Sequence, residues 1–176
     1  MKKPAAVEAS RSHSRPHVCM ECGSNLRISR EPHRYSLHPK WAITIADAEV
    51  RRCPSCGYFE VVIPKPDALH RTIAAEVIRK PARLSGPEFV FLRSELGLSA
   101  RKLARTIGVV HESISRWENG LLPVSPPVDR LMRTLIALTI DGEKFPVETL
   151  SHIEGDAGPL KIVVTVDRKG SWRRAA

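Results

Sequence analysis

Residues 99–120 read Ser99-Ala-Arg-Lys-Leu-Ala-Arg-Thr-Ile-Gly108-Val-Val-His-Glu-Ser-Ile-Ser-Arg-Trp-Glu-Asn-Gly120. This stretch predicts two short helices, at about 99–106 and 111–119, joined by a tight turn. Ser99 can cap the first helix, and Gly108 stands where the turn requires a positive φ or a missing Cβ. Apolar residues at helical spacing can form the seam between the helices: Leu103, Ile107, Ile114 and Trp117. Together these features predict a helix-turn-helix.

The second of these helices carries polar side chains on the face that points away from the seam. These side chains can reach base edges and phosphates in a DNA groove: His111, Glu112, Ser113, Ser115 and Arg116. Glu112 is unusual among them because a carboxylate repels phosphate, but it can accept a hydrogen bond from the amino group of cytosine. The alternative interpretation is a helical hairpin that has no role in DNA binding.

The segment resembles the Cro/lambda-repressor type of helix-turn-helix, whose pattern is roughly L-S-x-x-x-L-A-x-x-x-G-V-s-x-x-t-I-S-x-W-E-x-G. The resemblance implies a five-helix domain whose second motif helix enters the major groove, and a dimer that binds two half-sites. The positions where this family reads bases correspond to Glu112, Ser113 and Arg116. The positions where it contacts the DNA backbone or flanking groups correspond to Ser115, Arg101 and Lys102.

The same resemblance implies a structural salt bridge between Arg93 and Glu118. The sequence departs from the family pattern at two positions. Ala100 stands where the family often has Gln, and Val110 stands before the second helix where the family usually has Ser or Thr. Because Val110 has no side-chain acceptor, it cannot cap that helix. The base contacts of relatives should therefore not be transferred unchanged to this chain.

The chain is strongly basic, with a formal net charge of +9 over 176 residues. Between Arg79 and Arg116 there are eight basic and three acidic residues. Such an excess favours a polyanionic partner, because neutralised phosphates release condensed counterions; the alternative is a basic protein without such a partner. No apolar run reaches the roughly 18–20 residues of a membrane helix. Residues 1–17 lack an apolar signal core, so the cytoplasm is the expected compartment.

Two copies of one cysteine motif precede this region: Cys19-Met-Glu-Cys22-Gly and Cys53-Pro-Ser-Cys56-Gly. A two-residue spacing lets both thiolates of a pair face one ion, and four thiolates suit a single, closed, structural zinc site. An iron site of the rubredoxin kind fits the same spacing, and zinc is favoured because no nearby feature suggests electron transfer. A redox dithiol or disulfide bonds between these cysteines would also be compatible with the spacing. The nearby histidines are expected on the surface rather than as ligands: His13, His17, His33 and His38.

The rest of the chain contains strand-like and helical patterns. Thirty residues separate the two cysteine pairs, which predicts an inserted β-hairpin, as in a zinc ribbon. Strand-like runs occupy 41–45, 58–63 and 160–166. The last of these can close a sheet in the zinc domain or pair across subunits, and the sequence does not choose between the two.

Three further helices are predicted from apolar spacing and caps. A helix at 67–80 carries Leu69, Ile73 and Val77 on one face, and a capping box of Ser85 and Glu88 opens a helix at 87–96. The last helix, at about 126–140, has an apolar face formed by Val128, Leu131, Leu135 and Leu138. Burial inside the monomer is the default for the first and last of these faces. The face of the 126–140 helix is the better candidate for a dimer interface.

These predictions define an α+β chain, with a small N-terminal zinc-ribbon-like β domain followed by an all-α five-helix lambda-repressor-like helix-turn-helix domain. The expected boundaries are a disordered basic arm at 1–17, the four-cysteine domain at 18–65, a linker helix at 66–84, the DNA-binding domain at 85–150, and a C-terminal extension with one strand at 151–176.

The combination of cysteine pairs and helix-turn-helix resembles the MqsA family of zinc-binding antitoxins and regulators, over roughly residues 18–140. The resemblance implies a homodimeric transcriptional regulator, as a repressor of a palindromic operator in double-stranded DNA, and it raises the possibility of a toxin partner. The alternative is an interaction module whose zinc domain docks a protein while the helix-turn-helix anchors it to DNA. An enzyme is not expected, because the sequence shows no paired acids, nucleophile elbow or phosphate loop.

Overall fold

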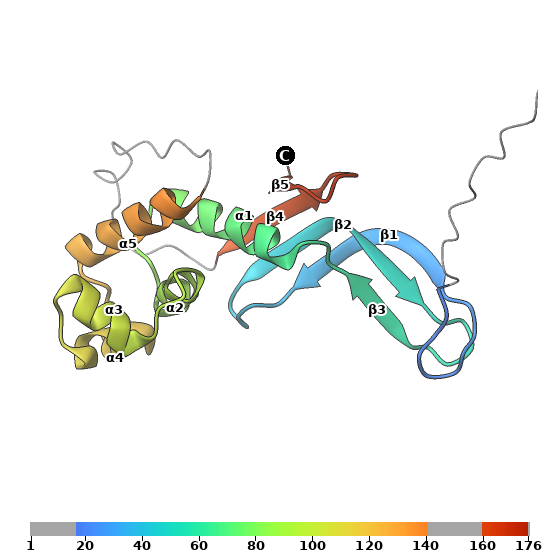
Figure 1. Ribbon diagram of the computed structural model, residues 1–176, viewed down its shortest axis with the longest axis horizontal. Helices are drawn as coiled ribbons and strands as arrows, with labels where there is room; N and C mark the ends of the chain where they lie inside the picture. The colour runs from blue at the N-terminus through green and yellow to red at the C-terminus, as the bar shows by residue number, and fades with distance from the viewer. Residues whose placement is uncertain (1–16, 141–159, 176) are drawn as a thin grey trace, which may run out of the picture. The chain divides into compact units, whose positions relative to one another are not determined.

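The computed structural model describes residues 17–140 and 160–175. The expected N-terminal arm lies outside the described residues apart from His17, as do the end of the expected DNA-binding domain and the start of the C-terminal extension. Helices and strands follow in the order β1(Arg27–Tyr35), β2(Ala42–Arg52), β3(Phe59–Val62), α1(Pro66–Arg79), α2(Gly86–Glu95), α3(Ala100–Ile107), α4(His111–Glu118), α5(Pro126–Thr139), β4(Lys161–Val166) and β5(Trp172–Arg174) (Figure 1). The α+β fold class is confirmed.

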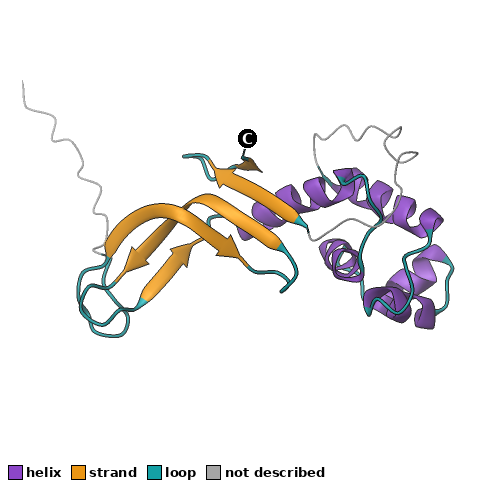
Figure 2. Ribbon diagram, turned by 180° about the vertical axis from the view of Figure 1, so that it is seen from behind, coloured by secondary structure: helices purple, strands orange, loops and turns teal. Residues whose placement is uncertain are grey.

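The chain divides into two compact units. Figure 2 distinguishes the strands from the helices of which these units consist. The first, here called the knuckle unit, consists of the described residues up to 29 together with 49–62. The second, the helical unit, consists of 30–48 and the described residues from 63 onward. Strands β1 and β2 contribute residues to both units. These two consecutive strands are hydrogen-bonded neighbours, so the hairpin expected between the cysteine pairs is present.

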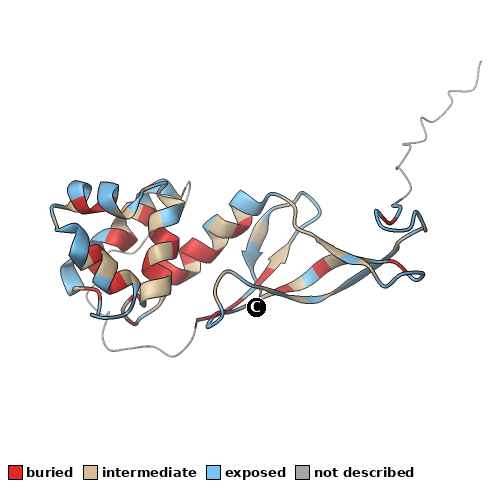
Figure 3. Cartoon of the chain, turned by 90° about the horizontal axis from the view of Figure 1, so that it is seen from below, coloured by how far each residue is buried: buried red, intermediate tan, exposed pale blue. Residues whose placement is uncertain are grey.

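The knuckle unit is held by short strand pairings and has almost no apolar core. β2 pairs antiparallel with β3, in a register that joins Glu49 to Val62 and Arg52 to Phe59. Arg51 contacts Glu49 on the same strand at 2.7 Å and Glu60 on β3, across the pairing, at 3.2 Å. Among the described residues of this unit, those that are buried are Cys19, Val50 and Cys53. Figure 3 shows how sparse the buried residues are around the knuckles compared with the helices.

The sheet of the helical unit joins segments from both ends of the chain. β2 pairs in parallel with β4, from Ala42 opposite Lys161 to Ile45 opposite Val164, and β4 pairs antiparallel with β5. The strand predicted at 160–166 is therefore confirmed, and it closes a sheet within the chain. Strand β5 was not predicted from the basic sequence at the end of the chain.

The helices enclose the main apolar core. α1 buries Leu69, Ile73 and Val77, the face that the sequence predicts, and it packs against α2 and α5 as well as β4 and β5. The capping box at α2 is also present, because Glu88 Oε2 accepts a hydrogen bond from the amide of Ser85 at 2.7 Å. Lys80 binds the same carboxylate through Nζ at 2.6 Å, a contact that ties the end of α1 to the start of α2.

Aromatic and polar side chains join the sheet of the helical unit to its helices. Trp41 is 2% exposed and meets Phe91 of α2 edge-on, with ring centroids 5.3 Å apart. His70 of α1 contacts the hydroxyl of Tyr35 through Nε2 at 2.9 Å and Glu95 through Nδ1 at 3.1 Å. Burial, together with the charge of Glu95, raises the pKa of Tyr35, so this hydroxyl stays protonated at neutral pH.

The predicted apolar face of α5 is only partly correct. Val128 is buried as expected, but Leu131 is 39% exposed and Leu138 is 79% exposed. The helix instead turns Met132 and Ile136 into the core. Two charged residues of α5 that the predicted face does not include, Asp129 and Arg133, are buried as well.

Asp129 and Arg133 of α5 form a fully buried ion pair, each with 0% relative exposure. Arg133 Nε lies 2.6 Å from Asp129 Oδ1, and its other nitrogens donate to three backbone carbonyls: Ile78 at 2.9 Å, Lys80 at 2.6 Å and Ala82 at 2.7 Å. Asp129 Oδ2 accepts from the amide of Leu84 at 2.6 Å. The pair thus fixes the segment between α1 and α2 to α5, and it satisfies backbone groups that burial would otherwise leave unpaired.

The start of α2 lies directly against the end of α4. A Cβ on Gly86 would come within 2.5 Å of the carbonyl oxygen of Glu118 and 2.7 Å of that of Trp117. Real side chains do not approach backbone atoms this closely, so only glycine fits. This contact sets the position of α4, whose outer face carries the residues predicted to contact DNA.

Candidate metal centre and candidate nucleic-acid interface

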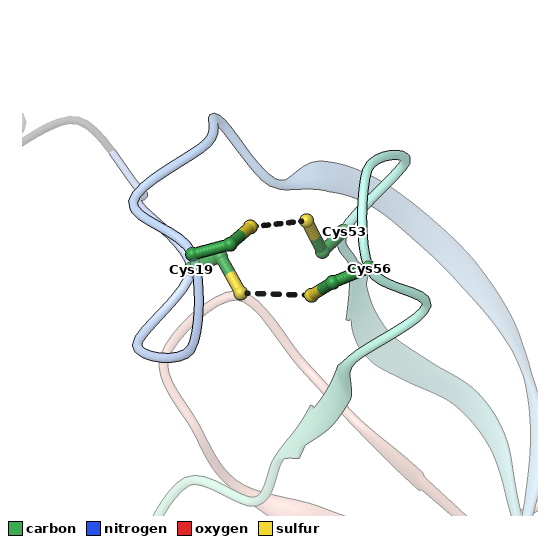
Figure 4. Close-up of side chains that lie close together, drawn as sticks. Cys19, Cys53 and Cys56 are labelled. Carbon is green, nitrogen blue, oxygen red and sulfur yellow. Dashed lines mark hydrogen bonds between the residues drawn. The ribbon is translucent and has the colours of Figure 1, made fainter.

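The four cysteine sulfurs form one cluster at the tip of the knuckle unit (Figure 4). Cys19 Sγ lies 3.6 Å from Cys56 Sγ, and Cys22 Sγ lies 3.4 Å from Cys53 Sγ. All four sulfurs lie within 4.8 Å of one another. A tetrahedral ion with metal–sulfur bonds of about 2.3 Å requires sulfurs about 3.8 Å apart. The cluster therefore has the size of a four-thiolate metal site, and its sulfurs are too far apart for disulfide bonds of about 2.05 Å.

Both knuckles have the same backbone geometry. The amide of Cys19 donates to Ser24 at 2.8 Å, and the amide of Cys53 donates to Tyr58 at 2.7 Å. The glycine after each second cysteine donates back to the first cysteine of its pair. Gly23 and Gly57 have φ values of 71° and 78°, a region that L side chains rarely adopt. This repeated turn explains why each pair is followed by glycine, and it aims both thiols of a pair at one point.

The surroundings of the sulfurs shift their acidity in opposite directions. Hydrogen bonds from the Ser24 side chain and amide lower the pKa of the Cys22 thiol to about 6. The Tyr58 amide also acts to lower the pKa of Cys56, but desolvation and the three neighbouring sulfurs outweigh it and raise that pKa to about 12. Four crowded thiols cannot all ionise unless a cation compensates their charge. The donor set and its crowding both fit a divalent metal ion.

The histidines near the knuckles do not join this cluster. His17 is exposed, His33 and His38 are half-buried, and His13 lies outside the described residues. Across residues 17–140 and 160–175, the four cysteines are the group that could hold a metal ion.

The helix-turn-helix consists of α3, a turn at Gly108, and α4. Ser99 accepts a hydrogen bond from the amide of Lys102 and so caps α3, and Gly108 ends it with a φ of 73°. Val110 precedes α4 and makes no side-chain cap, as its chemistry predicts. Three of the predicted seam residues are at most 8% exposed, namely Leu103, Ile114 and Trp117, and Ala104 is buried with them. Ile107, which was also predicted for the seam, is only partly buried.

Two contacts anchor this pair of helices to α2. The ring of Trp117 meets Phe89 edge-on, with centroids 5.9 Å apart. Arg93 Nε contacts Glu118 Oε1 at 2.5 Å, and Arg93 Nη1 donates to the carbonyl of Leu98 at 2.7 Å. The structural salt bridge that the sequence predicts between Arg93 and Glu118 is therefore present. The outer face of α4 is held rigidly relative to α2.

The residues predicted to contact DNA lie on the outer surface of α3 and α4. Four are exposed, namely Arg101, Lys102, His111 and Glu112, and Arg116 is exposed one turn further along α4. Ser113 and Ser115 are partly exposed. Ser115 also contacts Asn119 within the helix, because Asn119 Nδ2 donates to its carbonyl at 2.8 Å and to its hydroxyl at 3.4 Å.

A hollow of about 320 Å³ lies between the two helices and brings some of these residues together. Arg101, His111 and Glu112 line it, whereas Ser113, Ser115 and Arg116 do not. Arg105 also lines it and is exposed, although it was not among the predicted contacts. The sequence did contain a signal for Arg105. It lies four residues after Arg101 in the basic stretch, and residues at that spacing share one face of a helix.

Comparison with known protein families agrees with this geometry. A family model described as helix-turn-helix, of the Cro/lambda-repressor type, matches residues 92–144. The match includes all of α3 and α4 and covers less than a third of the 176 residues. Neither a search of curated proteins nor a search of solved structures found a match. Residues 92–144 therefore indicate a DNA-binding transcription regulator.

None of the helices in the described part of the chain is both long enough and apolar enough to cross a membrane.

Proposed function

We propose that this protein is a sequence-specific, DNA-binding transcriptional repressor that carries one structural zinc ion. The observation that carries the proposal is the helix-turn-helix, with a buried seam and an outer face of exposed polar residues on α4. In this class of motif the second helix enters the major groove, which admits an α-helix and displays a distinct pattern for each base pair. The net charge of +9 supports a nucleic-acid partner.

The side chains of the outer face divide by chemistry into base-reading and backbone-contacting groups. Arg116 can form a bidentate contact with guanine, and Glu112 can accept from the amino group of cytosine. Ser113 can donate or accept at either kind of base. Contacts to phosphates are assigned to Arg101, Lys102, Arg105, His111 and Ser115, since such contacts position a protein on the duplex without specifying sequence.

Zinc is proposed for the cysteine cluster because four thiolates in a closed site suit a structural zinc ion. Such a site leaves no open coordination position for a substrate, so no enzymatic activity is proposed. The cytoplasm remains the expected compartment. The ion would hold the knuckle unit in a defined shape. Whether that unit binds a protein partner decides between the repressor proposed above and a second candidate function.

The second candidate is an interaction module, and the exposed side chains of the knuckle unit favour it. Large apolar residues are exposed on this small unit: Val18 at 49%, Met20 at 84%, Ile28 at 50% and Phe59 at 52%. If they form one contiguous patch on this unit, such a patch would mark a protein-binding surface. In the antitoxin version of this proposal, a toxin would bind here. A reading frame for a small ribonuclease adjacent to this one would favour the antitoxin, and its absence would favour the regulator alone.

Homodimerisation is proposed through α5. Leu131, Leu135 and Leu138 lie at helical spacing, and Leu138 is 79% exposed in the single chain. A symmetric dimer places the same patch on both subunits and would match a palindromic operator.

We expect Leu138→Asp, combined with Leu131→Asp, to convert a dimer into a monomer, because both carboxylates would be buried without partners in the interface. Light scattering coupled to gel filtration should give twice the chain mass of 19.6 kDa for the wild type and the single-chain mass for the variant. Met20→Asp changes an equally exposed residue on another unit and should remain dimeric. A wild-type protein that is monomeric at micromolar concentration would contradict the proposal.

We expect Arg116→Ala to lower operator affinity by about 1–3 kcal/mol and to relax the preference for the base pair that Arg116 reads. The operator would first be identified by selecting bound duplexes from a random pool, which also reveals half-site spacing and symmetry. Gel-shift titration then compares the variant with Arg168→Ala, which removes the same charge from the turn after β4. Unchanged affinity and an unchanged selected sequence for Arg116→Ala would remove Arg116 from the base-reading residues.

A further inference from the structure

A second concave site lies far along the sequence from the helix-turn-helix, between α1 and β5. Its volume is about 480 Å³, and it is lined by one face of α1 together with residues 170–174. Five cationic side chains and one indole surround it: Lys65, Arg71, Arg79, Trp172, Arg173 and Arg174. All of these residues belong to the helical unit. None of them takes part in the metal centre or in the proposed DNA contacts.

The positive charge of this hollow is only partly compensated. Glu76 is the acidic residue in its lining, and its side chain is 14% exposed. It contacts Arg174 Nη1 at 2.9 Å and Arg79 Nη1 at 3.7 Å, so one carboxylate holds two guanidinium groups in place. Asp167 lies in the adjacent turn and accepts hydrogen bonds from the amides of Lys169 and Ser171. Counting both acids, the five cations still leave an excess of three positive charges.

The walls of the hollow are held in place by contacts between α1 and the turn that precedes β5. Trp172 Nε1 donates to the carbonyl of Pro64 at 2.8 Å. Lys65 Nζ donates to the carbonyl of Lys169 at 3.0 Å, and Lys65 has a φ of 47°, the one positive value at a non-glycine residue in the described chain. A left-handed conformation at a non-glycine residue costs of order 1–3 kcal/mol, and it persists only where contacts with the surrounding structure hold the residue in place. The hollow is therefore shaped before any ligand binds.

Arg71 is the cation of this hollow whose positive charge is least compensated by nearby carboxylates. It is exposed on α1, and no carboxylate contact is found for it within residues 17–140 and 160–175. Guanidinium groups bind phosphate through two parallel hydrogen bonds, which makes arginine clusters well suited to phosphate groups. The indole of Trp172 adds an apolar wall beside these charges, on which a planar group can lie.

We propose that this hollow binds a small molecule that carries two or more phosphate groups. Its volume falls within the range of about 300–1,000 Å³ that is typical of small-ligand pockets. A duplex would need a surface that follows its backbone, whereas these cations converge on one concave site. The site is independent of the proposed operator contacts, so either proposal can fail without the other.

The test is isothermal titration calorimetry of the full-length, metal-loaded protein with inorganic pyrophosphate and with ATP. We expect binding of both, and a loss of affinity of at least about a hundredfold in the double variant Arg71→Ala/Arg173→Ala, because each of the two lost charge-assisted hydrogen bonds contributes about a factor of ten or more. Arg168→Ala, which removes a charge from the same turn without lining the hollow, should change affinity less than twofold. Affinity for a duplex of random sequence should be the same in the double variant and the wild type.

Each arm of this experiment has an outcome that overturns the proposal. Absence of heat at millimolar pyrophosphate would show that the hollow is not a phosphate site. An equal loss of affinity in Arg168→Ala would show that the probe responds to net charge alone. A parallel loss of duplex affinity in the double variant would identify the phosphates as those of the DNA backbone rather than of a small molecule.

Discussion

Removal of the metal from the cysteine cluster is expected to unfold the knuckle unit while the five helices stay folded. The reason is the size of the apolar core in that unit. Of its described residues, Val50 is the one buried aliphatic side chain, and its burial contributes only about 1.5–3 kcal/mol. Binding of zinc by four thiolates contributes roughly 10–16 kcal/mol to the folding of such a unit. The helices have a separate core, which includes Leu69, Phe89 and Met132.

The measurement combines a chelator with two spectroscopic readouts. Amide signals of residues 18–29 and 49–62 should collapse to the chemical shifts of an unfolded chain, while helical circular dichroism at 222 nm should change little. Cys53→Ser should reproduce this effect without a chelator, and Ser55→Ala in the same knuckle should not. Elemental analysis should find one ion per chain. Visible absorbance would identify iron, whereas zinc is colourless. If chelation left the knuckle signals unchanged, the metal would have no structural role.

Arg133→Met is expected to reduce the free energy of unfolding of the helical unit by about 3–5 kcal/mol, because it leaves the buried carboxylate of Asp129 without its partner. The substitution also removes the donors for three backbone carbonyls, those of Ile78 and Ala82, which are buried, and that of Lys80, which is partly buried. For this reason, removing Asp129 as well should not restore stability. Replacing both partners of a buried ion pair with apolar residues often leaves stability unchanged. The failure of the double variant to regain stability would therefore be caused by the lost backbone contacts of Arg133.

Urea denaturation followed by circular dichroism would measure the effect. Arg130→Met is the matched control, since Arg130 is an exposed arginine on the same helix and should change stability by at most about 1 kcal/mol. If Arg133→Met prevents folding, Arg133→Lys keeps the charge but cannot supply all four hydrogen bonds, and an intermediate loss is expected. Equal midpoints for Arg133→Met and Arg130→Met would show that the buried pair does not hold the helices together.

Features encoded by local spacing were predicted from the sequence. The cysteine pairs, the helix-turn-helix and the capping box at Ser85 each depend on residues within a few positions of one another, and all three are present. The salt bridge between Arg93 and Glu118 was also predicted, but through a family resemblance rather than from spacing. Such local patterns are readable because their chemistry requires particular residue types at fixed intervals.

Features that depend on distant partners were missed or only partly predicted. The burial of Asp129 and Arg133 was not predicted, because the backbone carbonyls that Arg133 binds lie about 50 residues earlier in the chain. The apolar face of α5 was misplaced for the same reason. Strand β5 was missed because Trp172-Arg-Arg174 has no alternating pattern, and its pairing with β4 supplies the missing signal. Arg105 was overlooked because the hollow it lines exists only after α3 and α4 have packed.

The parallel pairing of β2 with β4 affects how the protein can be made. Ala42 and its partner Lys161 are separated by about 120 residues, and all five helices lie between them in the chain. Ribosomes add about 5–20 residues per second, so on the order of ten seconds pass after β2 is synthesised before β4 is complete. Throughout this interval the segment of β2 from Ala42 to Ile45 lacks its β4 partner, and an open strand edge can pair with other nascent chains. The helices can fold during the same interval, whereas the pairing of β2 with β4 must wait until residues 161–166 have left the ribosome.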